Sequence, residues 1–269
     1  MTEEKPQLGM IEPHRPLLKQ PNAGQKLYKV MTVENFIRSL NDNYLHFQRV
    51  DAYKDFPTAD QHDGERLLLD REVHKKLGFK KGPDFTAEDY YDLSRSRTYA
   101  CCFSLENSDY IWKEYGNAED SIGKICLEFD FEKLRQLLNE QLENAALICN
   151  GTRCHQIFPI NYGIVEYLKR DELMLSKERL ANPILYSYVK EKEPYEKENE
   201  LRVSLSALGM GQFALADGSI IQFPPSLQLR FQFRHAFASG AIEQILHIDN
   251  SLLPYLKAAM EKENFEPVL

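Results

Sequence analysis

Residues 26–50 read KLYKVMTVENFIRSLNDNYLHFQRV. Apolar and polar residues alternate over 26–30 and again over 44–50, which predicts two short strands. Between these strands, apolar residues recur at the i, i+3, i+4, i+7 spacing of one helix face: Val33, Phe36, Ile37 and Leu40. Thr32 stands where its side chain can cap that helix. The stretch therefore predicts a strand–helix–strand unit whose helix packs an apolar stripe against a sheet.

Outward from this unit, the same two patterns continue along the chain. Further strands are expected at 99–104, 123–130, 162–167, 201–206, 227–233 and within 240–248. Helices are expected over 131–147 and from 250 to 263, while 183–190 fits a strand or a short helix. Asp217-Gly218, between two short apolar runs, predicts a hairpin. Together these patterns predict an α+β fold with a mixed, mostly antiparallel sheet and flanking helices.

Two segments differ from this pattern. Residues 1–24 are rich in proline and poorly periodic, which predicts a flexible N-terminal leader, and they lack the apolar region of a secretory signal. Residues 51–98 are polar and broken by glycine and proline, with helices expected over 65–77 and 87–97. We interpret 51–98 as a helical insertion or lid over the sheet. Residues 25–269 are then expected to form a single α+β domain of the catalytic type.

The composition excludes several classes of protein. The chain has 269 residues, a net charge of −8 and 43% hydrophobic residues, enough for a core of its own. No apolar run approaches the roughly 18 residues of a membrane span, so we expect a cytoplasmic protein with no membrane partner. The chain contains no basic run, so we do not expect a stable complex with nucleic acid. A nucleic acid could still be a substrate. The five cysteines are expected to be reduced and buried, because they lack the spacing of a zinc site.

The most unusual local sequence is KEKEPYEKENELR, at residues 190–202. Glu198, Glu200 and Arg202 lie two apart at the start of a predicted strand, a spacing that puts all three side chains on one face. In a cleft, Arg202 would hold one carboxylate ionised while the other binds a substrate hydroxyl or stabilises a developing cation. The same alternating charge is typical of the solvated face of an edge strand, and the pattern alone favours that interpretation.

Two aromatic-rich stretches supply further candidates. The strand 99–104 begins with Tyr99 and ends with Ser104, and Trp112 and Tyr115 follow it. At a strand end the Ser104 hydroxyl could bind a ligand, or it could cap the next helix while Trp112 fills the core. In the first strand, Tyr28 and Lys29 lie on opposite faces, and a lysine in a strand usually faces solvent.

The order of these motifs resembles a large bacterial family of unknown function. The motifs that carry the resemblance are Leu27-Tyr-Lys29, Cys102-Phe-Ser104, Trp112-x-x-Tyr115-Gly116 and Glu198-x-Glu-x-Arg202. The resemblance covers about residues 26–206, and no such motif falls in 207–269. Residues 53–60 depart from the family, which often carries Asn-Asp-Pro-Phe after its second strand.

More distantly, the motifs resemble the ADP-ribosyltransferase fold of bacterial toxins that modify nucleic acid. Those enzymes carry Arg or His on a first strand, Ser or Tyr on a second, and a Glu, often in Glu-x-Glu, at the start of a later strand. The resemblance places Lys29 in the first-strand position, Ser104 in the second-strand position and Glu200 as the late-strand carboxylate. Lys29 departs from the Arg or His that those enzymes carry. It implies NAD as a substrate and no metal.

The chemistry expected from this resemblance is specific. Cleavage of the nicotinamide–ribose bond develops an oxocarbenium-like cation, which Glu200 would stabilise while Glu198 orients or deprotonates the acceptor. Arg202 would fix this pair or touch a phosphate. The remaining cofactor contacts would come from Tyr28, Lys29 and Ser104 and from stacking by Tyr99, Trp112 or Tyr115.

Such an enzyme would be a toxin or anti-phage effector that modifies a nucleic acid or a protein and is held silent by an antitoxin or another regulatory protein. One alternative is a non-enzymatic module that binds a ligand or partner in the same cleft. A nuclease or phosphohydrolase with a divalent ion is a weaker alternative, because the carboxylates beyond Glu198 and Glu200 do not cluster as metal ligands.

Overall fold

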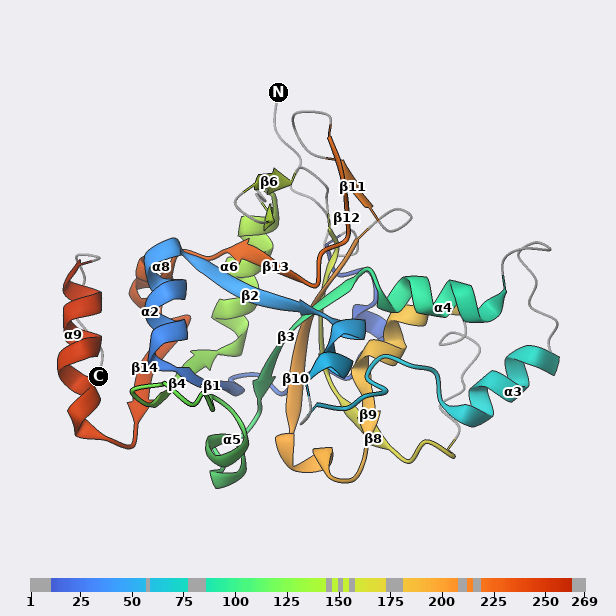
Figure 1. Ribbon diagram of the computed structural model, residues 1–269, viewed down its shortest axis with the longest axis horizontal. Coiled ribbons are helices and arrows are strands. Elements are labelled where there is room, and N and C mark those ends of the chain that lie inside the picture. Colours follow the sequence, from blue (N-terminus) through green and yellow to red (C-terminus); the bar gives the residue numbers. More distant parts are fainter. Residues whose placement is uncertain are drawn as a thin grey trace.

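The computed structural model describes residues 11–56, 59–76, 86–143, 147–149, 152–154, 158–172, 181–207, 212–214 and 219–262. Ten strands form one sheet in which every pairing is antiparallel, with the path β14-β4-β1-β3-β2-β13-β5-β6 and with β10 and then β7 added beside β3 (Figure 1). A separate strand pair, β8–β9, is parallel. The expected α+β class, with a mostly antiparallel sheet and flanking helices, is confirmed.

The strands of the large sheet are β1 (Lys26–Thr32), β2 (Tyr44–Arg49), β3 (Thr98–Ser104), β4 (Lys124–Asp130), β5 (Leu147–Cys149), β6 (Thr152–Cys154), β7 (Ile160–Ile164), β10 (Glu200–Ser206), β13 (Ser226–Arg230) and β14 (Ile242–His247). The smaller pairs are β8 (Glu166–Leu168) with β9 (Val189–Glu191) and β11 (Gln212–Ala214) with β12 (Ile220–Gln222). Strands β11 and β12 pair antiparallel, as the hairpin prediction requires, while the Asp217-Gly218 turn itself lies outside the described residues.

The α-helices are α2 (Val33–Asp42), α3 (Leu68–Lys76), α4 (Ala87–Arg95), α5 (Asp109–Glu114), α6 (Phe131–Glu143), α8 (Phe233–Ala238) and α9 (Leu253–Lys262). Short 3-10 turns are η1 (Arg15–Leu17), η2 (Val50–Asp55), η3 (Pro183–Tyr188), η4 (Tyr195–Glu198) and η5 (Asn250–Leu252). No helix within the described ranges combines the length and apolar character required to cross a bilayer.

The strand–helix–strand prediction for residues 26–50 is confirmed. The Thr32 hydroxyl accepts a hydrogen bond from the Asn35 amide at 3.1 Å and so caps α2. The helix ends at Asn43, which adopts the left-handed conformation that asparagine tolerates better than most residues. The apolar stripe of α2 is buried, as its spacing predicts.

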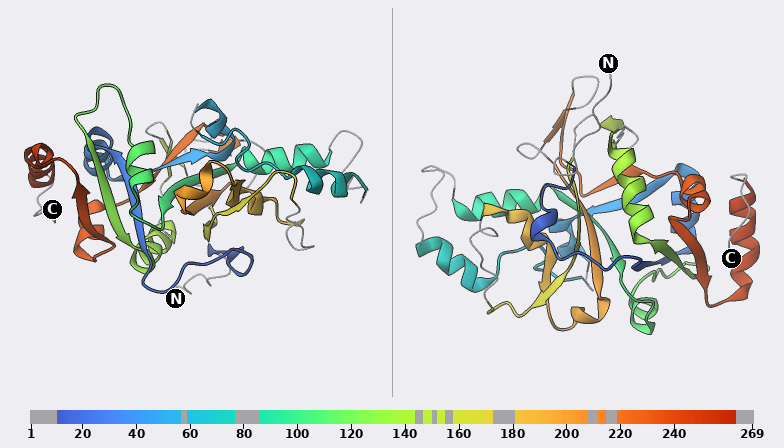
Figure 2. Two further views of the ribbon diagram at one scale, coloured as in Figure 1. Left: turned by 90° about the horizontal axis from the view of Figure 1, so that it is seen from below. Right: turned by 180° about the vertical axis from the view of Figure 1, so that it is seen from behind.

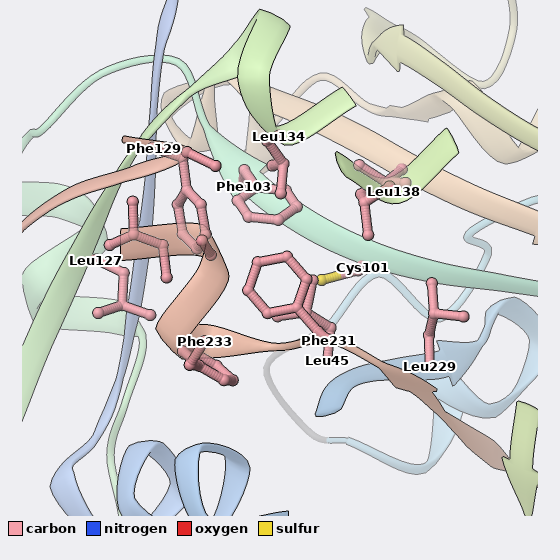
Figure 3. Close-up of a cluster of buried hydrophobic side chains, with 14 of the residues drawn as sticks. Leu45, Cys101, Phe103, Leu127, Phe129, Leu134, Leu138, Leu229, Phe231 and Phe233 are labelled. Carbon is pink, nitrogen blue, oxygen red and sulfur yellow. The ribbon is translucent and has the colours of Figure 1, made fainter. Parts of the chain in front are cut away.

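The core lies on one face of β3 and β10, because their alternate residues point to opposite sides of the sheet. The odd-numbered residues Cys101 and Phe103 of β3 are buried against Leu134 and Leu138 of α6 and beside Phe231 (Figure 3). The even-numbered residues of both strands face the other side of the sheet. Cys101 and Cys102 accordingly point to opposite faces, as expected from their adjacent positions in a strand.

Strand β3 is shared between two neighbours along one edge, and this divides the sheet. Strand β2 pairs with β3 only at Tyr99 and Ala100, and β1 pairs with it only at Ser104. The other edge of β3 pairs with β10 along its full length. Residues 101–103 therefore have no strand partner on the divided edge, where β1 and β2 diverge and leave a gap.

The described residues of the segment 51–98 are mostly helical. Its helices α3 and α4 project to one side of the molecule, at the end opposite α9 (Figure 2). Tyr91 of α4 packs with Tyr186 and Leu185 of η3 in a second apolar cluster, separate from the main core. The helices expected over 65–77 and 87–97 are present as α3 and α4. The described residues of 51–98 also supply part of the cavity wall described below.

The N-terminal residues that the structure describes are docked on the domain, which corrects the expectation of a flexible leader for 11–24. Glu12 is only 2% exposed and forms a bidentate ion pair with Arg135 of α6, with oxygen–nitrogen distances of 2.7 and 2.9 Å. The Ile164 amide of β7 donates to the Lys19 carbonyl at 2.8 Å. Proline content suggested a free chain, but a buried charge pair and backbone hydrogen bonds hold this segment in place.

We predict that Glu12→Gln lowers the free energy of unfolding by about 3 kcal/mol, because it removes the buried, bidentate counter-charge of the Arg135 guanidinium. Urea denaturation at neutral pH measures this loss. The matched control is Glu132→Gln, which removes an exposed partner of the same arginine and is expected to cost less than about 1 kcal/mol. Equal losses for the two variants would contradict a structural role for the docked segment.

Candidate functional site

A cavity of about 440 Å³ opens on the face of the sheet opposite the main core. Its floor is formed by even-numbered residues of four adjacent strands: Tyr28, His46, Gln48, Ala100, Cys102, Ser104, Glu200 and Arg202. The insertion forms one wall through Tyr53, Phe56 and Asp63, and Tyr115 and Lys190 line it as well. The cavity therefore gathers most of the residues that the sequence singled out.

Three of these residues lie in one row across the sheet. Tyr28 of β1 is directly opposite Ser104 of β3, and Ser104 is in turn opposite Glu200 of β10. Residues that face each other in antiparallel strands share a face, so all three side chains point into the cavity. The row crosses the one position where β1 and β3 still pair, at the edge of the gap.

Lys29 lies at this gap rather than in solvent. It is half-buried, and its Nζ donates to the Cys102 carbonyl at 2.9 Å, on the stretch of β3 that has no strand partner. The ammonium also stands 5.2 Å from the centre of the Phe103 ring. The expectation that Lys29 faces solvent is wrong. Its ammonium group binds the Cys102 carbonyl, which has no strand partner on this edge of β3.

Arg202 is the most enclosed charge in the site, and it is fully buried. Its Nη1 and Nη2 donate to the two oxygens of Asp63 at 2.7 and 2.8 Å, and its Nε and Nη2 donate to Glu200 at 2.7 and 3.2 Å. Nη1 also donates to the Ser187 carbonyl at 2.6 Å. These five contacts use all five N–H donors of a guanidinium. Two roles were expected for Arg202. The structure fits the first, because Arg202 fixes the Glu200 carboxylate, and it does not fit the second, because no donor is left for a phosphate.

Lys190 joins the two candidate catalytic carboxylates. Its Nζ lies 2.5 Å from Glu198 Oε2 and 3.1 Å from Glu200 Oε2, and all three side chains are buried. The other oxygen of Glu198 accepts a hydrogen bond from the Tyr115 hydroxyl. Glu198 thus accepts two hydrogen bonds and keeps lone pairs for a ligand, whereas the Glu200 oxygens already accept three from cations.

The two carboxyl groups have pKa values shifted in opposite directions. Burial raises the pKa of Glu198, and the repulsion of the adjacent Glu200 charge adds to this against the attraction of Lys190. Burial would also raise the pKa of Glu200, but Arg202 and Lys190 outweigh it and hold that pKa well below its ordinary value. The site therefore contains one carboxylate that stays ionised and one whose proton is held more tightly than that of an ordinary glutamate.

The turn before β10 places Glu198 beside Glu200. Glu198 ends η4, and Asn199, in a left-handed conformation, leads into the strand. The Ser104 hydroxyl lies 2.8 Å from the carbonyl oxygens of both Glu198 and Glu106, so it holds this turn against the end of β3. The Glu200 amide donates to the Tyr167 hydroxyl at 2.9 Å. Ser104 therefore lines the cavity and also fixes the backbone of the turn that carries Glu198.

Several expectations from the sequence need correction. Strand β10 lies between β3 and β7, so the edge-strand interpretation of Glu200 and Arg202 is wrong. Tyr99 is fully buried in the main core, and its hydroxyl donates to the Pro224 carbonyl, so it cannot stack on a ligand in the cavity. Ser104 does not cap α5, because Ser108 occupies the N-cap position.

Of the three aromatic candidates for stacking, the cavity contains only Tyr115. It is 41% exposed, although its hydroxyl is bound to Glu198. Trp112 is half-buried on α5, where its indole Nε1 donates to Asn107 Oδ1 at 2.7 Å, and it does not line the cavity. The cavity wall that the sequence assigned to Trp112 is formed instead by Tyr53 and Phe56 of the insertion.

Sequence reasoning missed two charged residues of the site. Lys190 stands at the start of the acidic stretch 190–202, but a lysine in a charge-rich segment gives no signal of burial. Asp63 precedes Gly64, whose positive φ angle and contact with Val50 leave no room for a side chain. The Asp-Gly pair marks a turn, and only the fold reveals that this turn lies against Arg202.

Comparisons of the chain with protein-family models, with curated proteins and with solved structures found no match.

We predict that Lys190→Met destabilises the protein by about 3–5 kcal/mol at pH 8, because it leaves two buried carboxylates without their shared cation. The pKa of Glu198 should rise further in this variant. A carboxyl whose pKa is raised in the folded state stabilises the fold below the unfolded pKa and loses that contribution as pH rises. The loss measured by urea denaturation should therefore be smaller at pH 5 than at pH 8.

The control for this experiment is Lys192→Met, which removes a half-exposed ion pair with Glu196. We expect it to cost less than about 1 kcal/mol and to show no such pH dependence. A Lys190→Met protein as stable at pH 8 as at pH 5 would contradict the bridging role.

Proposed function

We propose that this chain is an NAD-consuming ADP-ribosyltransferase and that the cavity is its active site. The observation that carries the proposal is a buried, ionised Glu200, in one row with Ser104 and Tyr28 across three strands, beside a second carboxyl whose pKa is shifted the opposite way. The motif resemblance supports the same assignment of Glu200. The proposal also includes the expected setting of a cytoplasmic bacterial toxin or anti-phage effector with a silencing partner.

The reaction requires charge stabilisation above all. As the bond between ribose C1′ and the nicotinamide nitrogen breaks, the nitrogen keeps the electron pair and the ribose carbon becomes positive. A carboxylate that is already ionised and rigidly held stabilises this charge without having to reorganise. Glu200 meets this requirement, since Arg202 and Lys190 keep it ionised while it lines the cavity.

Glu198 is suited to the proton transfer. When the acceptor nucleophile bonds to C1′, its proton must pass to a base within hydrogen-bond reach. Glu198 lies next to Glu200 and has lone pairs free, and its raised pKa brings it closer to the working pH. The proposed product is an ADP-ribosylated nucleic acid or protein, with free nicotinamide and a proton released.

The exposed aromatic residues of the cavity suit a planar ligand. Phe56 of the insertion is 48% exposed and Tyr115 is 41% exposed, and both line the cavity. Exposed rings at a cavity wall provide stacking surfaces for nicotinamide, for adenine or for an acceptor base. Lys29 supplies a cation at the opposite, divided edge of β3, where NAD phosphates would be attracted.

A metal-dependent nuclease is less compatible with this arrangement. Both oxygens of Glu200 are already bonded to cationic side chains, and Asp63 is held at both oxygens by Arg202. A divalent ion would have to displace these contacts to bind the same carboxylates. The positive charge that a divalent ion would bring to a nuclease site is provided here by Lys190 and Arg202.

We predict that Glu200→Gln lowers nicotinamide release by at least about 100-fold, because it removes the charge that stabilises the cation. The measurement follows nicotinamide release and label transfer from labelled NAD with RNA, with DNA and with cell lysate in separate reactions. Glu196→Gln, which changes an exposed carboxylate of the same segment, is the matched control and is expected to retain turnover.

A folded Glu200→Gln protein with full turnover would overturn the proposal. Release without transfer to any acceptor would identify an NAD hydrolase, and NAD binding without turnover would favour the non-enzymatic binding module.

We further predict that the rate of transfer falls on the acid side of its pH profile as Glu198 becomes protonated. Because its pKa is raised, this fall should occur above the ordinary glutamate value of 4.5. Rate measurements between pH 4.5 and 8 test this, and Glu198→Gln should remove the acid limb together with most of the transfer activity. An acid limb that persists in Glu198→Gln would assign the proton transfer to another group.

A further inference from the structure

The turn that carries Asp63 is built to present this side chain to Arg202. The Arg95 Nε of α4 donates to the Asp63 carbonyl at 2.6 Å, and Gly64 allows the chain to turn directly afterwards. Asp63 is 1% exposed, and both of its carboxylate oxygens bond to Arg202. A buried carboxylate at this position requires a partner, and Arg202 provides it.

Asp63 also decides how Arg202 can face Glu200. A planar guanidinium has its donors in a fixed fork, so a bidentate pair on the Nη edge leaves only the Nε side for a second carboxylate. With Asp63 on one edge, Arg202 meets Glu200 through Nε and Nη2. Without Asp63, Nη1 keeps only the Ser187 carbonyl, and the guanidinium loses the carboxylate that fixes its orientation toward Glu200.

Asp63 further balances the charge of the site. The carboxylates of Asp63, Glu198 and Glu200 face the two cations Lys190 and Arg202, so the cluster is neutral when one carboxyl carries a proton. That proton is best held by Glu198, which has the fewest cationic contacts. The charge of Asp63 therefore helps to keep Glu198 able to exchange a proton.

We propose that Asp63 is a positioning residue, through which the docked insertion 51–98 orients Arg202 and thereby sets the geometry of Glu200 and the protonation of Glu198. The expected effect of Asp63 on turnover rests on the proposed function. Its expected effect on the protonation of Glu198 does not. The insertion then controls assembly of the site, because α4 holds the Asp63 backbone through Arg95.

The groups that influence the titration of Glu198 come from several elements. Lys190 of β9, Glu200 of β10 and Tyr115 at the end of α5 act on it directly. Tyr110 of α5, Tyr167 of β8 and Tyr195 of η4 lie close enough to feel its charge. Asp63 acts through Lys190 and Arg202, and Arg202 acts through Glu200. In Asp63→Asn the negative charge is lost and Arg202 loses the carboxylate that orients it, so a change in Glu198 titration reports the loss of Asp63. Removal of a negative charge favours ionisation of the remaining carboxyls, so the shift must be to lower pH.

The test compares Asp63→Asn with Asp60→Asn in the full-length protein. Asp60 is buried in the same turn and accepts hydrogen bonds from the His62 and Glu191 amides, but it does not touch Arg202. For Asp63→Asn we expect kcat for NAD turnover to fall about 100-fold with little change in KM, and the acid limb to move to lower pH. For Asp60→Asn we expect the acid limb to stay where it is.

A second readout does not need turnover. Carbon-13 NMR of the Glu198 carboxyl, assigned with Glu198→Gln, measures its titration without NAD. A lower Glu198 midpoint in Asp63→Asn than in the wild-type protein supports the inference, whether or not NAD is turned over. A lack of NAD turnover in every variant would overturn only the proposed function. An unchanged midpoint in a folded Asp63→Asn protein overturns the inference.

Asp63→Glu keeps the test decisive if Asp63→Asn fails to fold. This variant retains the charge but lengthens the side chain, so we expect the wild-type Glu198 midpoint together with a lower kcat. Wild-type kcat in Asp63→Glu would contradict a positioning role.

Discussion

The Arg202 guanidinium connects more of this molecule than any other side chain we describe. It is fully buried, and its five donors are shared among Glu200 on its own strand, Asp63 of the insertion and the Ser187 carbonyl of η3. A buried cation is tolerated only when its donors are satisfied, so these three segments must meet at one point. The segment 51–98, the second apolar cluster and β10 are held together by this requirement.

The division of β3 between two neighbours creates the space that Arg202 borders. If β1 or β2 had paired along the whole strand, the edge of β3 would be closed and Lys29 would have no carbonyl to contact. Because the two strands diverge, a lysine side chain satisfies the Cys102 carbonyl, and the face above it remains open as the cavity. The same backbone arrangement thus provides a binding space and a cation at its edge.

Within that space, the protein separates the properties of two neighbouring glutamates. Glu200 is surrounded by cationic donors and stays ionised, while Glu198 is held by one shared ammonium and one tyrosine hydroxyl. A reaction that develops positive charge and releases a proton needs one group of each kind. Neither behaviour belongs to the Glu-x-Glu sequence itself, since the same two residues in water would titrate alike.

Local patterns of residues predict the secondary-structure elements and give the order of the motifs. Periodicity predicts the first strand, α2 and the alternating strand that carries Glu200, because backbone geometry and burial act over a few residues. Long-range packing, in contrast, places β10 inside the sheet and Tyr99 in the core, and it pairs Asp63 with Arg202 across 139 positions of the chain. The physical reason is that sheet pairing and desolvation select the partner of a buried charge, and the local pattern of residues contains no information about which distant segment will provide it.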